Sequence, residues 1–143
     1  MYVECDRVET MKIYITSPFR DGKNREEIEA LCEAVRSSGF EDFSFIRDIE
    51  HYEKMFNDPN ELMQRAKEEV EKCGALLINY DGPANGRMIE LGIAYALGKK
   101  IVLVTVRNTP VKDTVRGVAD AVIEYEQLED ISVPLSKLHD AWR

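Results

Sequence analysis

The chain has no apolar run long enough to cross a membrane and no pattern of a secretory leader. None of its hydrophobic stretches approaches the roughly 20 residues that a membrane-spanning helix needs. Residues 1–10 carry Glu4, Asp6, Arg7 and Glu9 where a leader has an apolar segment. We therefore expect a cytoplasmic protein with no membrane partner.

Cysteine and histidine are both scarce. The three cysteines, Cys5, Cys32 and Cys73, form no CxxC pair, and an odd number without paired spacing argues against a disulfide framework or a zinc site. His51 and His139 are isolated and lack metal-ligand spacing. The sequence thus predicts buried thiols in a reducing compartment and neither metal nor cofactor.

Basic residues are outnumbered by acidic ones. Lys plus Arg total 19 and Asp plus Glu total 27, so the net charge is 19 − 27 = −8. Because proteins that bind nucleic acid present a clustered basic face, no nucleic-acid partner is expected. A small anionic ligand remains open, since backbone amides at helix starts bind anions locally. The sequence also lacks GxGxxG, GxxxxGK[ST] and GxSxG, which argues against a dinucleotide fingerprint, a P-loop and a hydrolase elbow.

What the chain does have is a regular alternation of apolar runs and helical patterns. The apolar runs predict strands at 13–16, 43–46, 75–79, 101–106 and, more weakly, 121–125. The third and fourth runs are almost continuously apolar, which is typical of parallel strands covered on both faces. The 143 residues, 44% of them hydrophobic, suffice for one domain with its own core.

Capping residues mark the predicted helices between these strands. Helix starts are indicated by Ser/Thr/Asp/Asn residues followed by an apolar stripe, and by proline at the first helical position. The expected helices lie at 24–39 (cap Asn24, box residue Glu27), 58–73 (cap Asp58, then Pro59), 85–98 (cap Asn85), 109–118 (cap Thr109) and 128–142, where Pro134 interrupts the pattern.

Strand followed by helix, repeated, indicates right-handed crossovers. The predicted fold is α/β: a doubly wound, five-stranded parallel sheet of flavodoxin- or Rossmann-like type in a single domain over residues 12–143, after a loosely attached lead at 1–11. Ligands of such sheets bind beyond the carboxyl ends of the strands, where strand order reverses. The loops at 17–23, 80–87 and 107–110 should line that crevice.

Glu90 is the one charged residue in the apolar segment 89–98. A helix that is apolar all round should be buried among its neighbours, where an unpaired carboxylate is costly. Helical side chains lean toward the N-terminus, which directs Glu90 over Gly86 into the predicted crevice. A carboxylate there can stabilise or trap an oxocarbenium-like sugar carbon in glycosyl transfer. The alternative is a structural ion pair or a cap on a neighbouring amide.

Two loops offer ligand-binding groups. Asp81 can accept hydrogen bonds from a base or sugar, or simply form an Asx-turn. The amides at 85–87 open a helix and can hold an anion. In the loop at 17–23, Ser17, Arg20 and Lys23 supply a hydroxyl and two cations for a phosphate, with a purely structural loop as the alternative.

Three segments resemble the nucleoside 2-deoxyribosyltransferase superfamily. IYITSPF at 13–19 resembles its opening strand and loop. The stretch 75–102, which contains Asp81-Gly82 and Glu90-Leu91-Gly92, resembles its central signature. RGVAD at 116–120 resembles a late segment of the 2′-deoxynucleoside 5′-phosphate N-hydrolase branch. The resemblance implies cleavage or transfer at the N-glycosidic bond of a 2′-deoxynucleoside or its 5′-monophosphate, by a homodimer or larger homo-oligomer without a metal.

The resemblance also implies residue roles. Glu90 matches the nucleophile, Tyr14 the tyrosine that holds its carboxylate, and Asp81 an acidic residue near the nucleobase. The residues expected to meet the substrate or its phosphate are Ser17, Phe19, Arg20, Gly22, Asn85, Gly86 and Thr114, the last one reaching a neighbouring subunit.

Some positions depart from the family pattern. Ala66 stands where the family usually has an aspartate that assists the leaving base, Gly74 replaces another acidic residue, and Arg87-Met88 replaces a smaller pair. Without an acid a nucleobase leaves poorly, so Asp58, Asp81 or solvent would have to supply the proton. Two other functions therefore stay open: a non-catalytic nucleotide-binding module, and a phosphate-binding regulatory domain of flavodoxin-like fold.

Overall fold

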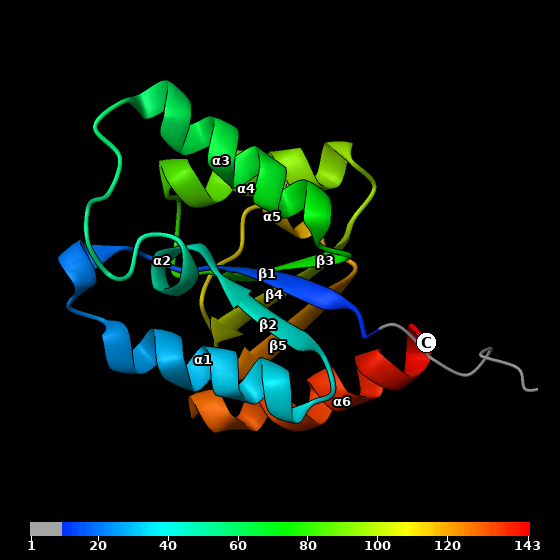
Figure 1. Cartoon of the computed structure of the whole chain (residues 1–143). Coiled ribbons are helices and arrows are strands. Elements are labelled where there is room, and N and C mark those ends of the chain that lie inside the picture. The colour runs from blue at the N-terminus through cyan, green and yellow to red at the C-terminus, as the bar shows by residue number, and fades with distance from the viewer. Residues whose placement is uncertain (1–9) are drawn as a thin grey trace, which may run out of the picture.

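The computed structural model describes residues 10–143, and within them five strands form one all-parallel sheet in the order β2-β1-β3-β4-β5 (Figure 1). This is the flavodoxin-like order, in which strand order reverses between β1 and β3. In register, Tyr14 of β1 pairs with Phe43 of β2 on one side and Leu76 of β3 on the other. The strands are β1 (Lys12–Thr16), β2 (Glu41–Ser44), β3 (Ala75–Asn79), β4 (Lys100–Val106) and β5 (Ala121–Tyr125).

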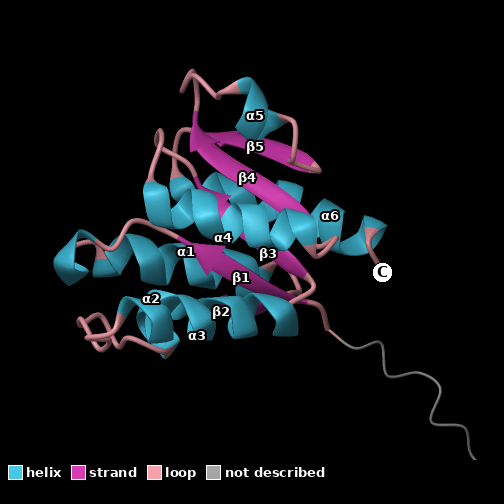
Figure 2. Ribbon diagram, turned by 90° about the horizontal axis from the view of Figure 1, so that it is seen from above, coloured by secondary structure: helices cyan, strands magenta, loops and turns pink. Residues whose placement is uncertain are grey.

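Helices cover both faces of the sheet. α1 and α6 lie on one face, and α3, α4 and α5 lie on the other (Figures 1 and 2). The helices of the described chain are η1 (Arg20–Gly22), α1 (Arg25–Ser37), α2 (Phe45–Asp48), α3 (Pro59–Lys72), α4 (Asn85–Ala96), α5 (Asp113–Arg116), η2 (Leu128–Ile131) and α6 (Ser132–Ala141). The predicted doubly wound α/β domain is confirmed.

Side-chain alternation along the strands divides the core into two clusters. Ile13 and Ile15 of β1 face the cluster under α1 and α6, while Tyr14 between them faces the cluster under α3 and α4. All residues of β3 are buried, as the continuous apolar run predicts. Of the predicted lead at 1–11, residues 1–9 lie outside the described residues; Met11 packs against the core, and its carbonyl accepts a hydrogen bond from Glu41 N at 3.0 Å.

Two predicted elements are wrong in extent. The strand predicted at 43–46 is β2, which ends at Ser44, because Ser44 Oγ accepts a hydrogen bond from Arg47 N and starts α2; Ile46 is therefore helical. The helix predicted at 109–118 shrinks to α5. Its predicted cap, Thr109, instead belongs to the turn after β4, where Asn108 adopts a φ of 68°.

The structure confirms some of the predicted helix-capping residues and not others. Asp58 accepts a hydrogen bond from Asn60 N ahead of α3, as predicted. Asn24 precedes α1 but makes no capping bond, because its amide donates to Pro18 O. Asn85 is the first residue of α4 rather than its cap. Pro134 is accommodated in the first turn of α6, where a backbone N–H has no partner within the helix.

The prediction that the segment at 89–98 is buried all round is wrong. Ile89, Tyr95 and Leu97 are 51%, 58% and 44% exposed. α4 packs against α3, β3 and β4, so these neighbours cover only one side of the helix. The other side of α4 therefore presents apolar side chains on the surface of the described chain.

The two cysteines among the described residues have buried thiols. Cys32 and Cys73 are buried and free, and Cys5 lies outside the described residues. No helix between residues 10 and 143 is both long and apolar enough to span a bilayer.

Candidate active site

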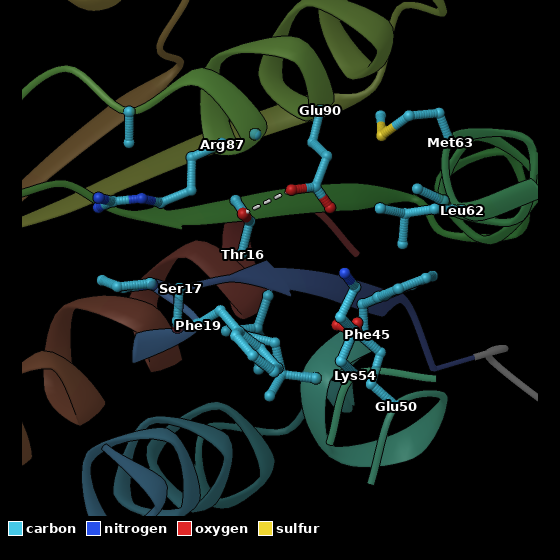
Figure 3. A pocket seen from close by; sticks show the side chains of 16 residues that line it. Thr16, Ser17, Phe19, Phe45, Glu50, Lys54, Leu62, Met63, Arg87 and Glu90 are labelled. Atoms are coloured by element: carbon cyan, nitrogen blue, oxygen red, sulfur yellow. Dashed lines mark hydrogen bonds between the residues drawn. The ribbon is translucent and has the colours of Figure 1, made fainter. Parts of the chain in front are cut away.

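A cavity of about 600 Å³ opens beyond the carboxyl end of β1, next to the point where strand order reverses (Figure 3). The volume lies within the range of small-molecule sites. Its walls come from the loop after β1, from α2 and the segment that follows, from α3, and from the start of α4. The loops at 17–23 and 80–87 contribute to it as predicted, but no residue of 107–110 does.

Glu90 reaches this cavity from α4 and is held by two hydroxyl groups of β1. Tyr14 Oη donates to Glu90 Oε2. Thr16 Oγ1 donates to Glu90 Oε1 at 3.0 Å, the bond that is dashed in Figure 3. Tyr14 and Thr16 are two residues apart on a strand, so their side chains project from the same face of the sheet. The strand thereby fixes both carboxylate oxygens.

The protonation state of Glu90 is set by opposing effects. Burial raises the pKa of Glu90 above its ordinary value, and the hydrogen bonds from Tyr14 and Thr16 and the charge of Arg87 offset only part of that rise. Burial, followed by the charge and hydrogen bond of Glu90, raises the pKa of Tyr14. The Tyr14 hydroxyl therefore stays protonated and remains a donor at physiological pH.

An ion-pair chain occupies the rim beside the cavity. The buried Arg87 donates to Asn79 O at 2.6 Å and pairs with Asp81 Oδ1 at 2.8 Å. Asp81 Oδ2 accepts from Arg20 at 2.8 Å, and Arg20 also lies 3.6 Å from Glu27. Arg20 and Asp81 are thus paired with each other, and neither is among the residues that line the cavity.

The other predicted binding residues divide into two groups. Ser17, Phe19 and Gly86 line the cavity, and within the described chain the buried Ser17 Oγ has no hydrogen-bond partner. Three residues do not line the cavity: Gly22, Asn85 and Thr114. Of these, Thr114 is exposed on α5, which would suit the predicted contact with a neighbouring subunit.

Several cavity residues were not anticipated from the sequence. Thr16 could have been found from its two-residue spacing to Tyr14. Glu50 and Lys54 come from the segment between α2 and α3 and lie across the cavity from Glu90 (Figure 3). Burial, supplemented by the charge of Glu90, raises the pKa of Glu50 to about 7. No spacing signal marks either residue.

The wall opposite the β1 loop is apolar. Phe45 of α2 and Leu62, Met63 and Ala66 of α3 line it. Ala66, where the resemblance implies an aspartate, is 3% exposed. The departure noted in the sequence therefore lies in the cavity wall itself.

The Glu90 carboxylate lies at the switch-point cavity of a parallel α/β sheet, where such sheets bind their ligands. The model of the nucleoside 2-deoxyribosyltransferase family matches residues 13–133, so the chain belongs to that family. No curated protein sequence matches the chain significantly.

Solved structures share the fold at low sequence identity. A CMP N-glycosidase of Clostridium botulinum aligns with a TM-score of 0.62 and 19% identity over 89% of this chain and 97% of its own. A 2-deoxyribosyltransferase of Bacillus psychrosaccharolyticus aligns with a TM-score of 0.69 and 21% identity over 87% and 95%. A conserved protein of Enterococcus faecalis V583 aligns with a TM-score of 0.75 and 17% identity over 90% and 99%.

Proposed function

We propose that the chain cleaves or transfers the N-glycosidic bond of a 2′-deoxynucleoside or its 5′-monophosphate, with Glu90 as the nucleophile. Family membership supports chemistry at this bond. The observation that carries the proposal is the Glu90 carboxylate, which faces a cavity large enough for a nucleoside and makes no ion pair among the described residues.

Glu90 attacks C1′ as the bond to the base breaks. The transition state resembles an oxocarbenium ion, which a nearby carboxylate stabilises before it closes the covalent bond. Tyr14 and Thr16 orient the carboxylate, so little reorganisation is needed during attack. Water or a second base then accepts the sugar from Glu90.

The loop after β1 is the part of the cavity proposed to bind a 5′-phosphate. The Ser17 hydroxyl is buried beside the cavity without a partner in the described chain and can donate to a phosphate oxygen. Gly86, at the start of α4, can offer its amide. Arg20 would have to exchange its contact with Asp81 for the phosphate, and Asp81 could then meet the base or sugar as the resemblance implies.

The decisive test is replacement of Glu90 by Gln, which keeps size and removes the nucleophile. We expect release of free base from a panel of deoxynucleosides and their monophosphates to fall at least ~10³-fold, with circular dichroism and thermal melting close to wild type. Glu71→Gln, at an exposed carboxylate of α3 outside the cavity, is the control. Retained base release in Glu90→Gln would refute the assignment of the nucleophile.

A non-catalytic nucleotide-binding module is the second candidate function. Ala66 favours it, because the cavity wall of α3 lacks the acid that the family pattern supplies. Chromatography for free base, set beside calorimetric titration with deoxynucleotides, separates the two. Binding without base release from the wild-type chain would support the module.

We also propose that the chain forms a homodimer or larger assembly in the cytoplasm. Ile89 and Tyr95 are exposed large apolar residues on α4, and Gly92 between them has open space where a side chain would stand. An apolar face of this kind favours association. The free, buried thiols of Cys32 and Cys73 are compatible with a reducing compartment.

A further inference from the structure

Two carboxyl groups share the cavity. Glu90 enters from α4, and Glu50 enters from the segment between α2 and α3 on the opposite side (Figure 3). Both line the same cavity, and the charge of Glu90 adds to the rise in the pKa of Glu50 that burial causes. Two neighbouring carboxylates do not ionise independently, and the first proton settles on the group whose charge is less well stabilised.

The surroundings of the two groups are unequal. Glu90 accepts hydrogen bonds from Tyr14 and Thr16, and Arg87 on the same helix adds positive charge. In the chain from residue 10 onward, no hydrogen bond and no ion pair within 4.0 Å reaches the Glu50 carboxylate. Burial raises the pKa of both groups, but only Glu90 has hydrogen bonds and a nearby positive charge that oppose the rise. The shared proton therefore belongs on Glu50, and the negative charge belongs on Glu90.

The other groups around Glu50 do not change this division. Lys54, on the same segment, is exposed to solvent although it also lines the cavity. The α3 wall contributes only apolar side chains, including Ala66. The β1 loop contributes the neutral Ser17 and Phe19. Tyr14 is protonated, and the charges on α4 are those of Arg87 and Glu90.

The backbone holds Glu50 in place. Glu50 N donates to Phe45 O at 3.0 Å, and Glu50 O accepts from Glu53 N at 2.9 Å. His51 and Tyr52 follow with φ values of 52° and 63°, a left-handed conformation that is unfavourable for such side chains and that clusters at functional sites. Glu50 is therefore anchored by a defined turn.

We propose that Glu50 is the general acid that protonates the departing base, an assignment that rests on the proposed function. It would replace the acid that is missing at Ala66. The sugar would lie between Glu90 and the base, and the base would lie along the apolar wall of Leu62 and Met63, within reach of Glu50.

Each step balances. As Glu90 forms its bond to C1′, the C1′–N bond breaks, its electron pair goes to the base nitrogen, and the Glu50 proton goes to the base. Water then attacks C1′, the bond between C1′ and Glu90 breaks, and the Glu50 carboxylate takes the proton of that water. Both carboxyl groups return to their starting states, and the products are the free base and the sugar.

The test of Glu50 as the general acid varies how much protonation the leaving base needs. Wild-type chain is assayed for base release from the common deoxynucleosides and their monophosphates. The accepted base is then compared with an analogue that needs less protonation: the 7-methylated base for a purine, or 5-nitrouracil for a pyrimidine. We expect Glu50→Gln to lower kcat by about 10²- to 10⁴-fold on the ordinary base and less than ~10-fold on the analogue. Glu53→Gln, at an exposed carboxylate of the same segment, should behave like wild type.

A pH profile adds a second readout. A general acid is lost on deprotonation, so kcat of the wild type should fall above about pH 7, following the pKa of Glu50, and Glu50→Gln should lose this dependence. An equal loss on ordinary and activated bases, or no loss at all, overturns the assignment while the proposed function stands. If the wild-type chain releases no base from any substrate, the proposed function fails and the assignment fails with it.

Discussion

Replacement of Glu50 by Gln should change how the stability of the fold depends on pH. Burial, supplemented by the charge of Glu90, raises the pKa of Glu50 from its ordinary value of 4.5 to about 7 in the folded chain. The folded state thus binds the proton more tightly than the unfolded state, and its stability is complete below pH 4.5 and declines as pH rises to about 7. At ~1.4 kcal/mol per pKa unit this rise corresponds to at most about 3 kcal/mol, and solvent screening of the part-exposed carboxyl group lowers that figure.

Glutamine cannot ionise, so Glu50→Gln should escape this loss. Urea unfolding at pH 4 and pH 8 gives the free energy of unfolding of each variant at both values. The difference between Glu50→Gln and wild type should shift in favour of the variant by up to about 3 kcal/mol on going from pH 4 to pH 8. Glu53→Gln, whose carboxylate is exposed, should show almost no shift. A difference that is the same at both pH values would refute the buried, proton-holding environment of Glu50.

Three further outcomes are expected. Tyr14→Phe removes a donor to Glu90, so kcat should fall about 10- to 100-fold, as for a lost hydrogen bond to a charged group, and the acid limb of the kcat/KM profile should move to higher pH; an unmoved limb would contradict the role of this hydroxyl. Glu90→Gln removes the charge that helps to raise the pKa of Glu50, so carbon NMR of the glutamate carboxyls should place the Glu50 titration at lower pH, and an unchanged midpoint would mean that burial alone is responsible. Tyr95→Glu puts a charge on the exposed apolar face of α4, so light scattering should report a smaller species than for wild type, unless the assembly uses another surface.

The sheet was predictable because its signals are local. Continuous apolar runs mark β3 and β4. The start of α3 is marked by the capping residue Asp58 and the proline that follows it. The ends of the helices and strands were harder to predict, because strand propensity and local side-chain hydrogen bonds can favour different structures at the same residues. Ser44 and Ile46 fit a strand by composition, but the hydrogen bond from Arg47 N to the Ser44 hydroxyl starts a helix there.

Of the candidate site, the sequence predicted the side with Glu90 and Tyr14 but not the side with Glu50. Glu90 stands out as a single charge in an apolar helix, and Tyr14 follows from the resemblance. Glu50 lies in a polar segment with other acidic residues, and nothing in the spacing separates it from Glu53. Its position depends on the turn at His51 and Tyr52, which lack the glycine or asparagine that signals positive φ.

The absence of an acid at Ala66 bears on the general-acid role proposed for Glu50, because both residues line the same cavity. An aspartate at Ala66 would stand in the apolar wall of α3, where Leu62 and Met63 offer it no hydrogen bond. With alanine there, the wall presents an unbroken apolar surface for the flat face of a base. Under the proposed function the acid would come from a neighbouring element that reaches the edge of the base, and Glu50 on the segment after α2 is the acid proposed above. Under the proposed mechanism, the donor-rich Glu90 supplies the charge for attack and the donor-poor Glu50 supplies the proton for departure of the base.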